Sequence, residues 1–283
     1  MIKKIRDWTY QHAIPAAFII FILVDCLLLG VGKLLELLPS SLPMKYLIEA
    51  VFIIIPIAIV IFFGFSRAFK NGKFFKGLIC CIPLIIIQLI VLLLFFSENL
   101  DNPSVTWKSS SMIILGLISV VGIGIREECI YRATIQNVIA KKHANSVKGI
   151  WITTIVSSVI FGLCHVPNLL FGVAPAAVLS QTISATFAGL FFGAIYLRCG
   201  NIWVPILLHT LTDIASLAQS TFLVGISDVE NISQYSISWL STIFIILLYG
   251  GLTAFLLRPS KCKQIYENLC FADKKSAEQP TNE

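Results

Sequence analysis

The sequence predicts an all-α integral membrane protein, a single bundle of about eight transmembrane helices around a polar cavity inside the membrane. Two features of its composition support this fold class. Of the 283 residues, 57% are hydrophobic and only 13% are charged, whereas soluble domains carry about 25% charged residues. The third observation is the even spacing of the hydrophobic runs, which argues for one bundle without an extramembrane domain.

Eight hydrophobic runs approach the length of about 20 residues that a helix needs to cross a bilayer. They cover residues 13–32, 46–65, 77–96, 111–140, 150–166, 174–197, 202–217 and 239–257. The first run lacks a small-residue cleavage site, so we expect it to stay in the protein as a membrane segment. The sixth run is rich in Ala, Gly and Ser, and we expect it to pack in the middle of the bundle.

The positions of lysine and arginine support this count of eight. Sixteen of the 21 Lys and Arg residues then lie on one side of the membrane and three on the other, and Arg126 and Arg132 lie within the fourth run. Because cytoplasmic loops are enriched in Lys and Arg, we expect a multi-pass protein of the cell membrane with both termini in the cytoplasm. This topology also explains the formal net charge of +6, so nucleic acid is not an expected partner.

The fourth run contains the charged stretch Arg126-Glu127-Glu128-Cys129-Ile130-Tyr131-Arg132. A charged side chain at the bilayer centre costs about 2.5–3.5 kcal/mol, so carboxylates inside a membrane mark a candidate functional site. On a helix, Glu128 and Arg132 share a face and can pair, while Glu127 points about 100° away and stays free to react. A structural network of both glutamates with Arg126 and Arg132 explains this stretch equally well.

Two further runs carry ionisable groups. The fifth ends at His165, which on its own resembles a packed, hydrogen-bonded residue. In the seventh, His209 and Asp213 lie one helical turn apart on one face, where an Asp can fix the tautomer and orientation of an imidazole. Counting along the runs puts Glu127 in the cytoplasmic half and His165 in the outer half, with an offset that could approach about 10 Å.

The remaining acidic residues inside or beside the runs are isolated from this set. They are Asp25, Glu36 and Glu49. We expect Asp25 near a helix end or facing a neighbouring helix, and Glu36 and Glu49 at segment ends.

Together the ionisable groups suit hydrolysis of a peptide bond in two ways. Glu127 can act as general base on a water with the help of His165, while other groups stabilise the oxyanion. Alternatively, His165 and His209 with a carboxylate, Glu127 or Asp213, can bind a divalent metal such as zinc that activates the water. The HExxH pattern of soluble zinc proteases is absent, and the sequence leaves the cofactor open.

The ordered motifs Glu127-Glu128-x-x-x-Arg132, Phe161-x-x-x-His165 and His209-x-x-x-Asp213 resemble those of the Abi/CAAX intramembrane protease family, also called CPBP. The resemblance covers about residues 111–219. This family includes the endopeptidase that removes the last three residues of prenylated CAAX proteins, and bacterial relatives linked to bacteriocin processing or immunity.

The resemblance implies roles for the motif residues. Glu127 matches the glutamate that activates water together with His165, and Glu128 with Arg132 matches a supporting pair. His209 and position 213 match the pair at the oxyanion, but this sequence has Asp213 where the prenyl protease has Asn. An ionised Asp cannot donate a hydrogen bond to an oxyanion. Asp213 therefore fits better as a metal ligand or as the group that orients His209.

The sequence as a whole thus predicts one polytopic domain over residues 1–283. It has N-terminal helices within 1–100, a catalytic core over about 111–219 and a cytoplasmic tail over 258–283. The expected activity is intramembrane cleavage of a membrane-anchored or prenylated protein or peptide, which reaches the site from the lipid or the cytoplasmic side. Membrane lipids are the other expected partners. The alternative is a non-catalytic membrane partner, or a bacteriocin-immunity protein, that keeps the polar cluster for structure.

Overall fold

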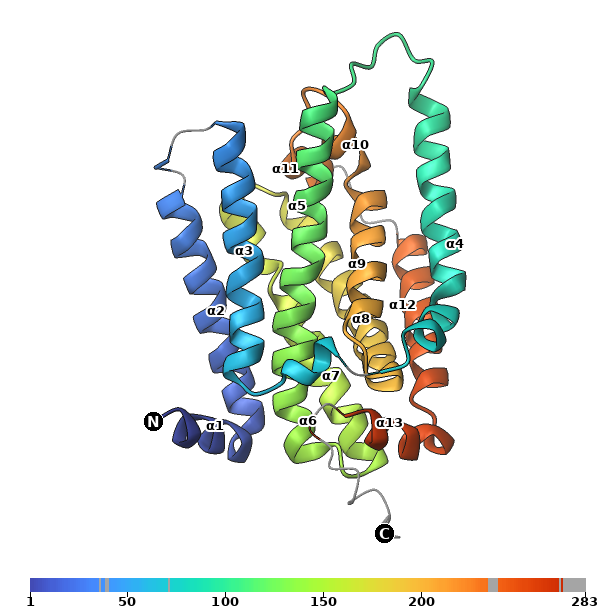
Figure 1. The fold of residues 1–283 in the computed structure, drawn as a ribbon. Coiled ribbons are helices and arrows are strands. Elements are labelled where there is room, and N and C mark those ends of the chain that lie inside the picture. Colours follow the sequence, from blue (N-terminus) through green and yellow to red (C-terminus); the bar gives the residue numbers. More distant parts are fainter. Residues whose placement is uncertain (36, 39–40, 71, 234–238, 270, 272–283) are drawn as a thin grey trace.

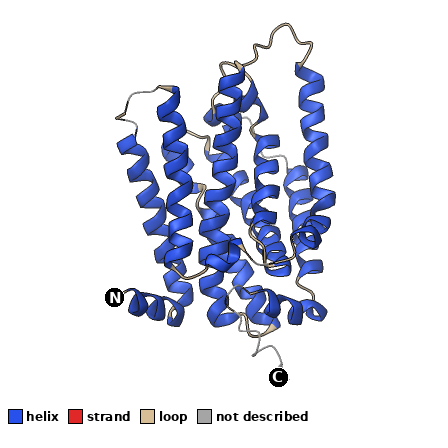
Figure 2. Cartoon of the chain, in the orientation of Figure 1, coloured by secondary structure: helices blue, strands red, loops and turns tan. Residues whose placement is uncertain are grey.

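The computed structural model of the chain describes residues 1–35, 37–38, 41–70, 72–233, 239–269 and 271. Within these residues the regular structure is helical, apart from one isolated antiparallel bridge between Trp107 and Leu223 (Figure 2). The predicted all-α class is confirmed. Of the isolated acidic residues, Glu36 lies outside the described residues.

Within the described part of the chain, five helices are long and apolar enough to cross a membrane, or six if a bent pair near the C-terminal end is one span. They are α2 (Ala13–Leu35), α3 (Leu42–Phe62), α4 (Phe74–Asn99), α7 (Val147–Leu163) with the 3₁₀ turn Val166–Phe171, and α8 (Pro175–Cys199); the bent pair joins α12 (Trp239–Leu256) to α13 (Cys262–Asn268). The chain is therefore a multi-pass membrane protein, while the number of eight spans stays a prediction.

The predicted segment 111–140 forms one continuous helix in three parts. These are α5 (Ser110–Glu128), the π-helical segment η2 (Cys129–Gln136) and α6 (Asn137–His143). The predicted segment 202–217 is α9 (Trp203–Ser216), and two short helices follow it, α10 (Ala218–Phe222) and α11 (Asp228–Ser233). The basic N-terminus forms a helix of its own, α1 (Ile2–Gln11).

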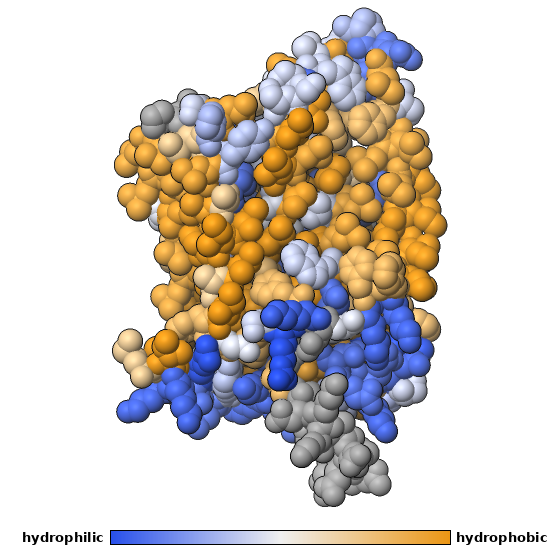
Figure 3. Space-filling model, viewed as in Figure 1, coloured by the Kyte–Doolittle hydropathy of each residue, from blue (hydrophilic) through white to orange (hydrophobic). Residues whose placement is uncertain are grey.

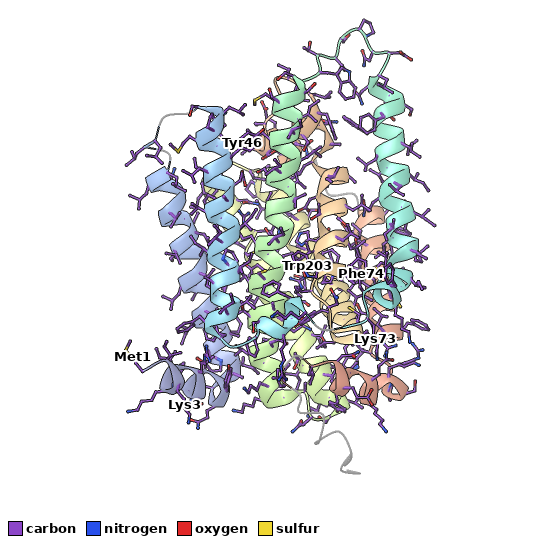
Figure 4. All side chains as sticks on the ribbon, viewed as in Figure 1. Met1, Lys3, Tyr46, Lys73, Phe74 and Trp203 are labelled. Atoms are coloured by element: carbon purple, nitrogen blue, oxygen red, sulfur yellow. The ribbon has the colours of Figure 1, made fainter. Side chains whose placement is uncertain are left out.

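Figure 3 shows a broad hydrophobic belt across the face of the bundle in view, with hydrophilic residues gathered in a band at its lower end. Helices α1, α6 and α13 lie at this lower end (Figure 1), and so do the labelled side chains of Lys3 and Lys73 (Figure 4). The gathering of basic residues at one end agrees with the predicted count of Lys and Arg on alternate sides. That this end faces the cytoplasm remains a prediction, and we call it the basic end.

Helix α8 packs in the middle of the bundle, against α4, α7, α9, α12 and α13. Its small residues allow this close packing, as predicted. A Cβ atom on Gly162 of α7 would lie 1.9 Å from Oγ1 of Thr186 in α8, and a Cβ on Gly193 would lie 2.7 Å from the side chain of Gln136. These backbones can approach so closely only because the two positions carry no side chain.

The short turn between α6 and α7 fixes the relative depth of two candidate residues. Glu127 lies sixteen residues before His143, and His165 lies eighteen residues after Val147. At about 1.5 Å per residue, both lie some 24–27 Å from this turn, so their depths differ by only about 3 Å. This estimate is smaller than the predicted offset of about 10 Å, because the ends of the hydrophobic runs do not coincide with the turn that both helices share.

Candidate active site

The charged motif lies where the long central helix changes from α-helical to π-helical geometry. Glu127 and Glu128 end α5, and η2 begins at the next residue. All eight residues of η2 are buried, and the hydroxyl of Thr134 donates to the backbone oxygen of Cys129, five residues earlier, at 3.0 Å. Short π-helical insertions occur frequently at functional sites. This one lies against α2, α3, α7 and α8.

Three of the predicted site residues form a dry chain of charges. Arg132 Nε lies 3.2 Å from Oε2 of Glu128, and Nδ1 of His209 lies 2.8 Å from Oε1 of the same carboxylate. The exposed fractions are 1% for Arg132, 0% for Glu128 and 5% for His209. Glu128 pairs with Arg132 as predicted, and it also joins α5 to α9 through His209. Because a carboxylate only accepts, Nδ1 of His209 is the donor in this bond.

Two phenyl rings enclose this chain. The Arg132 guanidinium lies 4.2 Å from the ring centroid of Phe161 and 5.6 Å from that of Phe192. The imidazole of His209 stacks on Phe192 at 5.1 Å between centroids and meets Phe161 edge to face at 5.7 Å. Cation–π attraction is strongest where water is excluded, so the rings stabilise the guanidinium and fix the plane of the imidazole.

The second ring nitrogen of His209 faces two carboxylates. Nε2 lies 3.6 Å from Oε2 of Glu127 and 3.5 Å from Oδ2 of Asp213. The side chains of Glu127 and Asp213 are 17% and 18% exposed, in contrast to the fully buried Glu128. The site therefore has a dry side, held by Glu128, and an open side where Glu127 can meet a water and a substrate.

His165 joins the same site through Phe161. Its ring meets Phe161 edge to face at 5.5 Å between centroids, and Nδ1 lies 3.3 Å from the Phe161 backbone oxygen. Since His209 contacts the same phenyl ring, both imidazoles pack against the side chain of Phe161. Phe161 thus connects His165, just after α7, to His209 of α9, which in turn lies beside Glu127 of α5.

The structure refines two expectations about orientation. The group that fixes His209 by a short hydrogen bond is Glu128, at 2.8 Å, whereas Asp213 lies at 3.5 Å. The Arg126 guanidinium lies 5.7 Å from the ring centroid of Phe52 in α3, and it acts electrostatically on Asp213 and Asp25 but forms no ion pair with Glu128 among the described residues. Arg126 is therefore not a direct counter-charge of the buried chain, and Arg132 alone supplies that charge.

Asp25, which the sequence gives no part in the site, lies beside it. The hydroxyl of Tyr131 in η2 lies 3.5 Å from Oδ1 of Asp25, and the Asp25 carboxylate lies within electrostatic range of Glu127. Asp25 lies twelve residues into α2, so it is not at a helix end. The signal in the sequence is its isolation, because a lone carboxylate in the middle of an apolar run requires a partner from another helix.

The predicted metal ligands do not meet in the geometry that a metal site needs. Among the described residues, no group of three or more His, Cys, Asp or Glu side chains is arranged so that it could hold a metal ion. The residues Glu127, His165, His209 and Asp213 therefore do not form a ready set of ligands.

Fold and site together define a class: an integral membrane protein with carboxylate and imidazole groups gathered inside its helical bundle. Residues 109–215 match the family model described as type II CAAX prenyl endopeptidase Rce1-like. This confirms the family resemblance, over nearly the residues that the motifs indicated, and the family implies a protease. No curated protein and no solved structure matches the chain. Helices α1 to α4 lie outside the matched residues.

Proposed function

We propose that the protein is an intramembrane endopeptidase that hydrolyses a peptide bond in a membrane-anchored or lipidated protein or peptide. The observation that supports this proposal most is that two successive glutamates contact opposite ring nitrogens of one histidine. Glu128 holds Nδ1 of His209 on the dry side, and Glu127 faces Nε2 on the open side. Water activation requires a buried group that orients the imidazole and a base that water can reach beside the same imidazole.

In the proposed mechanism, Glu127 takes a proton from a water molecule as the water oxygen attacks the carbonyl carbon of the substrate. His209 carries a proton on each ring nitrogen in this step. Nδ1–H donates to Glu128, and Nε2–H donates a hydrogen bond to the tetrahedral oxyanion. His165, which acts electrostatically on Glu127, helps to hold the water. The proton on Glu127 passes to the leaving amine as the C–N bond breaks, so the carboxylate is regenerated.

The remaining motif residues act as positioning residues. Arg132 balances the charge of Glu128, whose carboxylate oxygens lie 3.2 Å from Arg132 Nε and 2.8 Å from His209 Nδ1. Asp213 is an acceptor, and from 3.5 Å it favours a proton on Nε2 of His209. In this arrangement Asp213 does not contact the oxyanion, which resolves the difficulty of an acidic residue at this position.

The proposal is tested with the purified full chain and a library of membrane-anchored peptides. Glu127→Gln keeps the size of the side chain but removes its basicity, and we expect cleavage to fall by about 10²–10⁴-fold, the usual contribution of a general base. The matched control is Glu98→Gln, a carboxylate-to-amide change at an exposed position of α4. Undiminished cleavage by Glu127→Gln would contradict the mechanism.

A second candidate function is a non-catalytic membrane partner, such as a bacteriocin-immunity protein. The completely buried Arg132–Glu128 pair favours it, because such a pair can serve structure alone. The discriminating observation is the cellular phenotype of Glu127→Gln at normal expression and melting temperature. A retained phenotype supports the partner, and a lost one supports the protease.

Topology and location belong to the same proposal. We infer one polytopic domain in the cell membrane, with eight spans and the basic end in the cytoplasm. Labelling of single cysteines placed in α1 and in the α4–α5 loop from either side of the membrane tests this orientation. The two positions lie at opposite ends of the bundle (Figure 1), so they must react from opposite sides.

A further inference from the structure

A cleft of about 260 Å³ lies between α3, α5 and the end of α9 with α10, away from the basic end. Helix α5 lines it with Met112, Leu115, Gly116, Ser119, Val120 and Ile123. These positions are three or four residues apart, so they form one face of the helix. The next positions on that face are Arg126 and Glu127. The cleft thus leads along α5 towards the proposed base, which lies four residues, or about 6 Å, beyond Ile123.

Two carboxylates line this cleft, and that of Glu49 is the one nearer to the proposed base. The sequence places it at the end of a segment, but α3 begins at Leu42, so Glu49 lies seven residues, or about 10 Å, inside the helix. Ser119 Oγ donates to its Oε1 at 2.8 Å. A Cβ atom on Gly122 would lie 3.3 Å from its Oε2, so the missing side chain at this position leaves room for the carboxylate.

Glu49 forms no ion pair within the described residues, although Lys45 lies one turn before it on α3. None of the ion pairs between described side chains includes it. A carboxylate at such a depth is costly unless it serves a partner or a ligand. Ser119 supplies one hydrogen bond but no charge, so a cationic group that enters the cleft would find an anion already oriented.

The other charged residues of the cleft lie farther from the proposed base. Lys45 precedes Glu49 by one turn of α3, towards the outer end of the cleft, and Lys108 precedes α5. The Lys108 ammonium is bonded to the backbone oxygen of Ser220, and Asp228 lies at the start of α11. Figure 3 shows hydrophilic residues interrupting the upper part of the hydrophobic belt over α3 and α5. The cleft therefore has a mixed outer end and a single anion in its inner part.

Distances along α5 relate Glu49 to the scissile bond. Its two contacts on α5, Ser119 and Gly122, lie eight and five residues before Glu127, which is about 8–12 Å. An extended peptide advances about 3.3 Å per residue. A substrate with its scissile bond at Glu127 would therefore place a side chain at Glu49 two to four residues away.

We propose that this cleft binds the substrate peptide in an extended form and that Glu49 selects a lysine or arginine two to four residues from the scissile bond. The inference rests on the proposed endopeptidase function and adds its substrate class. It also gives the peptide a path from the end of the bundle away from the basic end, in addition to the lipid and cytoplasmic routes that the sequence suggests.

The test starts from a peptide that the purified full chain cleaves in lipid vesicles. Pairs of peptides carry either lysine or uncharged norleucine at each position two to four residues from the scissile bond, on both sides. We expect kcat/KM for lysine to exceed that for norleucine at least 10-fold at one position. Glu49→Gln should bring this ratio near 1, while the matched control Glu98→Gln keeps it. Glu49→Lys should invert the preference towards a glutamate at the same position.

Each other outcome overturns the inference. A ratio near 1 at every position for the wild type would show that Glu49 selects no cationic side chain. A preference that survives Glu49→Gln would assign the selection to another group. If the wild type cleaves none of the peptides, the endopeptidase proposal fails first and this inference fails with it; cleavage without a charge preference leaves that proposal standing. The melting temperature of each variant shows whether it is folded.

Discussion

The buried chain of charges makes a quantitative prediction for Arg132→Met. The guanidinium is 1% exposed, and its anionic partner is Glu128, which is itself completely buried. Removing one partner of a buried ion pair costs about 3–5 kcal/mol, because the other charge stays without compensation. Loss of the contact with Phe161, 4.2 Å from the guanidinium carbon, adds up to about 2 kcal/mol. We expect Arg132→Met to lower the free energy of unfolding by at least about 3 kcal/mol.

The double variant separates the pair from its surroundings. Arg132→Met combined with Glu128→Gln leaves neither charge buried, so its loss of stability should be smaller than the sum of the two single losses. We expect a coupling energy of about 2–3 kcal/mol. The free energies are measured by denaturant unfolding in detergent micelles, with the four proteins of the cycle under identical conditions. Single losses below about 1 kcal/mol, typical of exposed pairs, would refute the argument that this pair is dry.

Three further predictions follow from the packing and the site. Gly162→Ala should destabilise the bundle by about 1–3 kcal/mol, because its Cβ would overlap Thr186, while Gly30→Ala, with open space at its Cβ, should unfold like the wild type. Phenanthroline or EDTA should leave peptide cleavage intact, since the described residues offer no metal ligand set; inactivation that zinc reverses would instead establish the metal branch. Asp213→Asn should retain cleavage within about 10-fold, because Asn keeps an acceptor oxygen, whereas Asp213→Leu should lose more; equal kinetic losses in both would show that the charge itself is required.

The membrane explains why so much of the site is predictable from the sequence. Few ionisable residues occur inside hydrophobic runs, so Glu127, His165 and His209 are conspicuous in the sequence alone. Their spacing on regular helices also predicts the pairing of Glu128 with Arg132, which the structure contains at 3.2 Å. In a soluble enzyme, the same residues would be lost among many charged surface positions.

The features that the sequence does not predict depend on contacts between helices. The bond from His209 to Glu128 joins residues 81 positions apart, and no local pattern indicates it. The π-helical geometry of η2 is equally hidden, since nothing in the sequence of its eight residues distinguishes them from an ordinary α-helix. The depth of His165 is set by the position of the α6–α7 turn, and the ends of hydrophobic runs locate such turns poorly.

The sequence gives no sign that Asp25 and Glu49 have partners, for the same reason. Each resembles an isolated carboxylate, and each meets a side chain of the long central helix, Tyr131 for Asp25 and Ser119 for Glu49. Their partners belong to other helices, so sequence spacing cannot reveal them. An unexplained charge inside a membrane segment is thus better interpreted as half of a pair whose other half lies elsewhere in the chain.

The two sides of the site differ in their charge balance, and this difference bears on the substrate. On the dry side, Arg132 compensates Glu128, so burial leaves no net charge there. On the open side, Glu127 and Asp213 face the single imidazole of His209, and Asp25 lies nearby. Arg126 lies within electrostatic range of Asp25 and Asp213, so with a protonated His209 the three carboxylates leave one formal negative charge on this side. A cationic side chain of a substrate would compensate this charge, which agrees with the basic peptide proposed for the cleft.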